Sequence, residues 1–191
     1  RQLGRPVADT VMRRPYVQMQ SLLDATQPKG RRYYWKSHYL ADIDRRTIAL
    51  AAEHAGRIRS PHSAILLFQI QGALNECPAG YSPAGNRNAA YVLNIAGSWE
   101  SADDDAVNMA WARECFEATR ACSTGGTYIN FLTEEEGRDR IDAAYSPADL
   151  DRLAALKRIY DPENLFRHTK SVAASSAGPP AVAAHDGCRM D

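Results

Sequence analysis

The chain has 191 residues, enough for one domain with a substantial hydrophobic core. Lysine plus arginine and aspartate plus glutamate both number 23, so no net charge attracts the chain to nucleic acid or to an anionic membrane. No apolar run approaches the roughly 20 residues that a membrane helix requires. The sequence therefore predicts neither nucleic acid nor a membrane as a partner.

The N-terminus and the cysteines bear on processing and compartment. Residues 1–6 lack both an initiator methionine and the apolar core of a signal peptide, so we expect a fragment or a processed product. The four cysteines, at positions 77, 115, 122 and 188, form no Cys-x-x-Cys pair. A disulfide framework is not expected, and a reducing cytoplasm is the expected location.

Three regions are expected along the chain. Residues 1–30 form a boundary segment with a weak helical pattern from Val17 to Ala25. Residues 31–172 form the main domain. Residues 173–191 are rich in alanine, serine, glycine and proline and have little to bury, which predicts a disordered tail.

The first part of the main domain predicts a strand and a helix. Residues 31–40 alternate well enough for a strand that places alternate side chains on opposite faces. One face would carry Tyr33, Trp35, Ser37 and Tyr39, and the other Tyr34, Lys36, His38 and Leu40. A helix capped by Asp42 or Asp44 should then run to about Arg59. Its apolar face would comprise Ile48, Ala51, Ala52, Ala55 and Ile58.

The middle of the chain predicts two more strands and a longer helix. The continuous apolar run 64–71 indicates a central strand, and residues 89–96 indicate another after a loop at 76–88. A helix is expected over 103–122, with three acidic residues at its positive end. Its buried stripe would comprise Val107, Trp111, Cys115, Ala118 and Cys122. Both cysteines on this stripe are interpreted as small buried hydrophobic residues.

Two helices are expected near the end of the main domain. A short charged helix should cover 134–144, and Pro147 should open another whose inward side chains are Leu150, Leu153, Leu156 and Tyr160. The few strands, separated by helices and long loops, favour an α+β fold. We expect an antiparallel sheet with helices packed on one face.

The stretch from Ser123 to Leu132 joins two of these helices. It predicts a Gly-Gly turn followed by a strand from Thr127 to Leu132. On such a strand Tyr128 and Asn130 would share one face, and Ile129 and Phe131 would be buried on the other. The pattern alone is more typical of an edge strand with a wet face.

Common catalytic motifs are missing from the sequence. It contains no dinucleotide-binding, P-loop or zinc-protease signature and no G-x-S-x-G, so an unrelated hydrolase of the same fold class lacks support. The five histidines show no metal-ligand spacing, and His54 and His62 are expected at the surface. The acidic triplets at 103–105 and 134–136 are interpreted as helix starts. No metal site is expected.

Four motifs in the second half of the chain resemble one known family. They are Tyr128-Ile-Asn-Phe, Ala144-Tyr145, Leu153-Ala-Ala-Leu-Lys157 and Tyr160-Asp-Pro-Glu-Asn-Leu-Phe-Arg167. Their order and spacing resemble the C-terminal berberine-bridge-enzyme-like segment of the FAD-linked oxidases. The run Tyr34-Trp-Lys-Ser37 also matches. The resemblance covers residues 31–167.

The resemblance implies a fold, a cofactor and site residues. The sheet would carry berberine-bridge-enzyme-type helices after it, and its open face would roof the flavin. Tyr128 would take the proton from a substrate hydroxyl, while Asn130 and Asn164 would contact FAD. A phenol has a reference pKa of about 10, so this role requires nearby charge or donors that stabilise the phenolate. The N-terminal FAD-binding domain of the family is missing from these residues.

The sequence therefore predicts the C-terminal substrate-binding part of an FAD-dependent oxidoreductase. Its small-molecule substrate would be an alcohol or carry a C–H bond beside a heteroatom, with oxygen as the electron acceptor. This piece alone would be inactive, because flavin does the redox chemistry. The alternative is a non-catalytic remnant or a stand-alone binding domain without a flavin domain.

Overall fold

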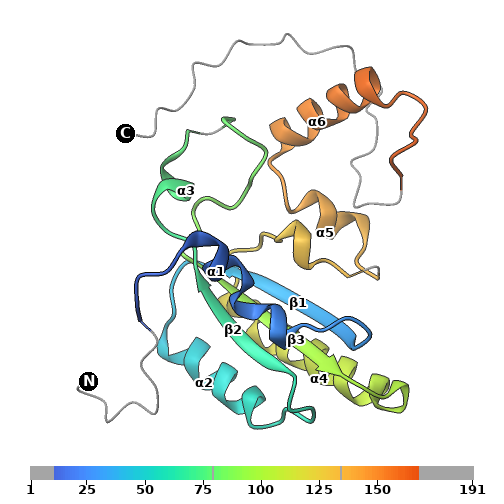
Figure 1. Cartoon of the computed structure of the whole chain (residues 1–191). Coiled ribbons are helices and arrows are strands. Elements are labelled where there is room, and N and C mark those ends of the chain that lie inside the picture. Colours follow the sequence, from blue (N-terminus) through green and yellow to red (C-terminus); the bar gives the residue numbers. More distant parts are fainter. Residues whose placement is uncertain (1–10, 79, 134, 168–191) are drawn as a thin grey trace. The chain divides into compact units, whose positions relative to one another are not determined.

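The computed structural model describes residues 11–78, 80–133 and 135–167, so the predicted tail at 173–191 lies outside the described residues. The chain divides into two compact units, Arg1–Arg31 and Arg32–Asp191. The first contains helix α1 (Tyr16–Gln20) and the 3-10 helix η1 (Ser21–Thr26). The second contains the sheet and the other helices (Figure 1). Along the described residues, no helix has the length and apolar composition needed to cross a bilayer.

The sheet has three antiparallel strands, β1 (Arg32–Leu40), β2 (Ala64–Gln69) and β3 (Tyr91–Trp99). Their order is β1-β3-β2, which confirms the expected α+β fold with an antiparallel sheet. The prediction that the run at 64–71 is the central strand is wrong, because β3 lies between the other two. The apolar run does not encode how many neighbours a strand pairs with, and no residue of β2 is fully buried.

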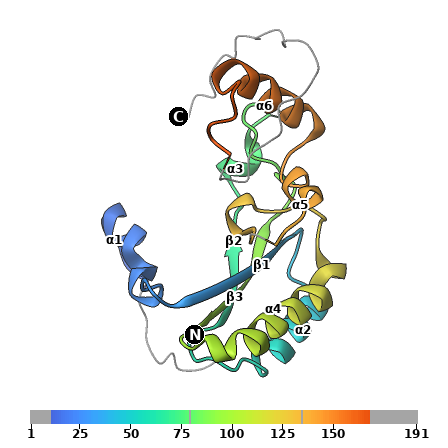
Figure 2. The same ribbon diagram turned by 90° about the vertical axis from the view of Figure 1, so that its right-hand side faces the viewer.

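Two helices cover one face of the sheet, α2 (Arg45–Ala55) and α4 (Asp105–Thr119). Figure 2 shows both on the same side of the strands. The core on this side joins Tyr34, Ile95 and Trp99 of the sheet to Trp111 and Cys115 of α4. Burial raises the pKa of the Cys115 thiol to about 12, as expected for a buried hydrophobic cysteine. We call this side the helix-covered face.

The opposite side of the sheet is called the open face. Its residues follow from the register, in which Trp35 lies opposite Ala96, Ser37 opposite Asn94, and Tyr39 opposite Val92. On β2, Phe68 lies opposite Val92 and so joins the same face. The side-chain alternation predicted for residues 31–40 is confirmed, since Tyr34 and Lys36 lie on the helix-covered face.

Helix α2 begins where the sequence predicts, but the side chains that face the core are partly different from the predicted ones. Asp44 caps it, accepting a hydrogen bond of 2.7 Å from the Thr47 amide. Ile48, assigned to the apolar face, is 55% exposed, whereas Thr47 and His54 are buried. The prediction that His54 lies at the surface is therefore wrong: the Trp111 indole donates to its carbonyl at 2.9 Å and ties α4 to this stripe. The predicted stripe is supported at Ala51 and Ile58, which are half-buried, and is wrong at Ile48, Ala52 and Ala55, which are exposed.

The later helices show the same pattern of correct starts and partly incorrect faces. Ser146 caps α6 (Pro147–Tyr160), which confirms Pro147 as its first residue. The inward assignment is wrong for Leu156 and for Tyr160, which is 80% exposed, because α6 buries its alanines 154 and 155 instead. On α4, Val107 is exposed as well. The charged helix predicted at 134–144 is shorter, α5 (Arg138–Asp142). Other short helical segments are α3 (Ala73–Glu76), η2 (Ala102–Asp104) and η3 (Arg120–Cys122).

The prediction of a strand from Thr127 to Leu132 is wrong. Residues Ile129–Phe131 form the 3-10 helix η4, preceded by Tyr128 in an extended conformation. The amides of Phe131 and Leu132 donate to carbonyls three residues earlier, at 3.0 and 3.3 Å. The segment lies across the open face, where ring contacts hold it. Its backbone hydrogen bonds are formed within the segment, as in other 3-10 turns.

The close pairing of β1 and β3 at Gly97 gives a stability prediction. A Cβ atom added there would lie 2.8 Å from the Tyr34 carbonyl oxygen and 3.3 Å from the Trp99 ring. Gly97→Ala should therefore lower the free energy of unfolding by about 1–3 kcal/mol in urea titrations. The control is Gly56→Ala, whose Cβ would meet nothing nearer than 3.4 Å. Equal stability of the two variants would contradict the close approach.

Candidate functional site on the open face

Tyr128 is held on the open face between two aromatic rings. Its ring packs edge-on against Tyr39 of β1, with centroids 6.4 Å apart, and against Phe131, with centroids 4.9 Å apart. Phe131 in turn packs edge-on against Trp35 at 5.5 Å and beside Phe68 at 6.4 Å. These contacts fix the direction of the phenol by packing against two strands of a rigid sheet.

Asn130 and Tyr128 are brought together as the sequence predicts, but by a different route. The Asn130 side-chain amide donates a hydrogen bond of 2.9 Å to the Tyr128 hydroxyl oxygen. The 3-10 turn brings the two side chains together, in place of the expected strand alternation. An amide donor at a phenol oxygen stabilises the charged form of the phenol, so the pair has the chemistry of a proton acceptor with a supporting donor. Asn130 is exposed and Tyr128 is half-buried.

Three further polar atoms near this pair are buried without a hydrogen-bond partner in the described part of the chain. They are the Trp35 indole nitrogen, the Asn94 side-chain oxygen and the Thr127 hydroxyl oxygen. Trp35 and Asn94 belong to the open face by the register of β1 and β3. Buried polar atoms are nearly always paired in folded proteins, so unpaired ones mark a place where a ligand can complete the hydrogen bonding.

Asn94 was missed by the sequence interpretation. A signal for it exists, because it is the one strongly polar residue inside the apolar run Tyr91–Ala96. A buried amide at the centre of a sheet must find partners or cost free energy, so its presence there indicates either an internal hydrogen bond or a ligand contact. The structure leaves the Asn94 oxygen unpaired among the described residues.

Asn164, the third predicted site residue, lies in a turn that follows α6. Its φ angle is 54°, a left-handed conformation that asparagine tolerates, and its amide donates to the Asp161 carbonyl at 3.1 Å. The Asp161 carboxylate organises this turn: it accepts from the Leu165 amide at 2.6 Å and from Lys157 at 2.5 Å. No described hydrogen bond or ring contact joins Asn164 to Tyr128 or Asn130. The structure thus supplies a turn-forming role for Asn164.

Comparisons with known proteins find a family likeness in the C-terminal part of the chain. Residues 127–173 match the family described as "Berberine and berberine like". The likeness to this family by its model is thus confined to that segment of the chain. An FAD-linked oxidoreductase of Dictyostelium discoideum is 24% identical over 171 residues, which are 88% of this chain and 37% of that protein. An aclacinomycin-N/aclacinomycin-A oxidase of Streptomyces galilaeus is 24% identical over 124 residues, 56% of this chain and 23% of the relative.

Solved structures of berberine-bridge-enzyme-like oxidases share the fold. The 6-hydroxy-D-nicotine oxidase of Arthrobacter nicotinovorans superposes with a TM-score of 0.67 at 23% identity, covering 90% of this chain and 39% of that one. The berberine bridge enzyme of Eschscholzia californica gives 0.66 at 15% identity, covering 80% and 35%. The chain thus spans little more than a third of the length of these relatives.

The relative from Dictyostelium discoideum is named as FAD-linked, so the open face was compared with the needs of a flavin. Tyr128 and Asn130 offer a donor and an acceptor suited to the polar edge of a flavin ring or to a substrate lying against it. A glycine-rich phosphate-binding motif is missing from the sequence. The described residues therefore fit the ring-facing wall of a flavin site, and the dinucleotide would need further binding elements.

The buried Tyr39 beside Tyr128 gives a pH prediction. Burial, and then the neighbouring Tyr128, raise the pKa of Tyr39 to about 12, above the value of about 10 in an unfolded chain. Between these values only the unfolded chain ionises at this position. The free energy of unfolding should therefore fall by about 2–3 kcal/mol from pH 10 to pH 12 on account of Tyr39.

Urea titrations at pH 9 and pH 12 on wild type and Tyr39→Phe would measure this loss. The Phe variant should lose less stability across the interval by that amount. Tyr160→Phe is the control, because Tyr160 is 80% exposed, and it should follow the wild type. Parallel loss in all three proteins would show that Tyr39 is not buried as described.

Proposed function

We propose that this chain forms the substrate-side wall of an FAD-dependent oxidoreductase, with Tyr128 as proton acceptor. The observation that carries the proposal is the hydrogen bond from Asn130 to the Tyr128 oxygen, on a sheet face with unpaired buried polar atoms. The substrate is a small molecule that carries a hydroxyl or a C–H bond beside a heteroatom. Flavin, when bound, supplies the acceptor for the hydride.

Each residue of the candidate site has its own role in the proposed reaction. Tyr128 takes the substrate proton, a role that requires a phenol oxygen within hydrogen-bond reach of the substrate. Asn130 donates to that oxygen and stabilises its charged form. Tyr39 and Phe131 hold the ring in place and exclude water from one side of it.

A flavin-binding domain is the partner that this proposal requires. Support comes from an apolar surface on α6 and the turn after it, where Ile159, Leu165 and Phe166 are exposed by 57%, 67% and 74%. Large exposed apolar side chains close together in the sequence are typical of a segment that another domain or protein covers. Reduction of bound flavin and oxidation of the substrate would then take place at the open face.

The base assignment is tested with Tyr128→Phe in the flavin-containing protein. The variant should keep its bound flavin, because the ring contacts are preserved, while anaerobic reduction of flavin by substrate slows by about 100-fold or more. Stopped-flow absorbance of the flavin measures the rate, against a panel of alcohols, sugars and amines. Tyr145→Phe serves as a matched phenol control outside the site. Reduction at the wild-type rate in Tyr128→Phe would remove the catalytic role from Tyr128.

The partner assignment is tested with Ile159→Asp, which places a charge in the apolar surface of α6. If a flavin domain covers that surface, the variant should purify with less than about half of the wild-type flavin content, measured by absorbance. Ile48→Asp is the matched control, since Ile48 is equally exposed on α2. Protein that is colourless even as wild type would instead favour a binding domain without redox activity.

A further inference from the structure

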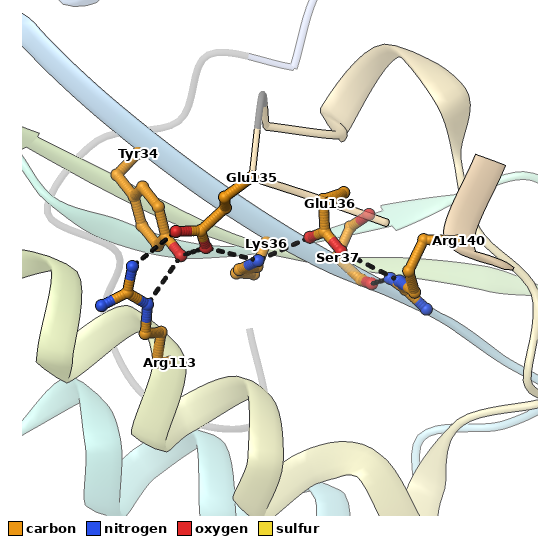
Figure 3. A network of polar contacts seen from close by, with 7 residues as sticks. All are labelled: Tyr34, Lys36, Ser37, Arg113, Glu135, Glu136 and Arg140. Carbon is orange, nitrogen blue, oxygen red and sulfur yellow. Dashed lines mark hydrogen bonds and ion pairs between the residues drawn. The ribbon is translucent and has the colours of Figure 1, made fainter. Parts of the chain in front are cut away.

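The segment that carries Tyr128 and Asn130 is fixed to β1 at both of its ends. At the first end, the Thr124 amide donates to the Tyr39 carbonyl at 2.9 Å, and its hydroxyl donates to the same oxygen at 3.3 Å. At the second end, Glu135 and Glu136 reach the side chains of β1 from the loop before α5 (Figure 3). The two site residues lie between these anchors.

The second anchor is a buried ion pair. Lys36 is only 7% exposed, and its ammonium lies 2.6 Å from Glu136 and 3.0 Å from Glu135. The other oxygen of Glu136 faces the guanidinium of Arg140 at 3.3 Å. A buried ammonium that loses its carboxylate is left uncompensated in a poorly solvated position, which makes this pair a strong local constraint.

The same anchor extends to helix α4. Tyr34 donates its hydroxyl to Glu135, and Arg113 of α4 pairs with that carboxylate while its Nε donates to the Tyr34 oxygen at 3.0 Å (Figure 3). Because Trp111, Ala112 and Cys115 of α4 belong to the core, the loop is bound both to β1 and to a helix that is packed on the sheet. The anchor is therefore a network and not a single contact.

The second anchor and the aromatic contacts of the segment lie on opposite faces of β1. Lys36 points to the helix-covered face, whereas Trp35 and Tyr39, which contact the Tyr128–Phe131 segment, point to the open face. The segment thus crosses the open face and returns to the other side of the same strand. Its length between the anchors sets how far Tyr128 can move along the sheet.

We propose that Lys36 and Glu136 are positioning residues for Tyr128 and Asn130. The buried ion pair closes the segment over the open face, so that the phenol and the amide keep their hydrogen bond and their place above the sheet. The catalytic part of this inference rests on the proposed function, whereas the closure of the segment does not.

The closure is tested by hydrogen exchange on the chain with Glu136→Gln, which keeps the shape of the side chain and removes its charge. Amides of residues 127–133 should exchange about tenfold faster or more, while those of β3 keep their wild-type protection. A 3-fluorotyrosine resonance assigned to Tyr128 should broaden or shift in the same variant. Lys36→Arg, which keeps the charge, should restore most of the protection that Lys36→Met loses.

A matched control is available in Arg57→Gln, because Arg57 and Glu53 form an ion pair that is more than half exposed. It should leave both the exchange and the fluorine resonance unchanged. Unchanged exchange at 127–133 in Glu136→Gln would overturn the proposal. Equal acceleration in β3 would also overturn it, since the pair would then stabilise the whole domain and not the segment.

The flavin-containing protein separates this inference from the proposed function. If Tyr128→Phe slows flavin reduction, Glu136→Gln should lower the rate constant of reduction at saturating substrate about tenfold, with little change in substrate affinity. A wild-type rate in Glu136→Gln, beside a slow Tyr128→Phe, would refute the positioning role. If Tyr128→Phe reduces flavin normally while Glu136→Gln loosens the segment, the proposed function fails and the closure stands.

Discussion

The alternation of side chains along β1 is the constraint on which the rest of the structure depends. Trp35 and Tyr39 point to the open face and receive the segment with the candidate base, while Tyr34 and Lys36 point to α4. One nine-residue strand therefore supplies both the surface of the site and the attachment of the loop that completes it. A shift of register by one residue would exchange the two sets and remove both functions at once.

The parts of this fold that could be predicted are those encoded by local signals. Strand β1 shows its alternation in the sequence, and the caps Asp44 and Ser146 are polar residues whose side chains satisfy the first helical amides. Helix faces were harder to predict because alanine gives a weak signal. On α2 the side chains that pack inward are Thr47 and His54, which no apolar stripe would select.

The site could be predicted in part, through the resemblance to a family and not through periodicity. Tyr128 and Asn130 do meet, yet Asn130 lies in a 3-10 turn that Tyr128 directly precedes, because the ring contacts of Phe131 hold the segment on the face of the sheet. For the carboxylates that hold its far end, the sequence predicts only a helix start. Their partner Lys36 is about 100 residues away in the sequence, and no local pattern links such distant charges.

Strand β2 carries a consequence for the behaviour of this domain in solution. It is an outer strand of the sheet, and its six residues, Ala64–Gln69, include no charge and no proline. Backbone groups along such an uncharged rim are a template on which a foreign strand can assemble. The solubility of the isolated domain at high concentration will therefore depend on what covers the outer edge of β2. A lysine substituted on this strand should reduce fibrous or amorphous self-association.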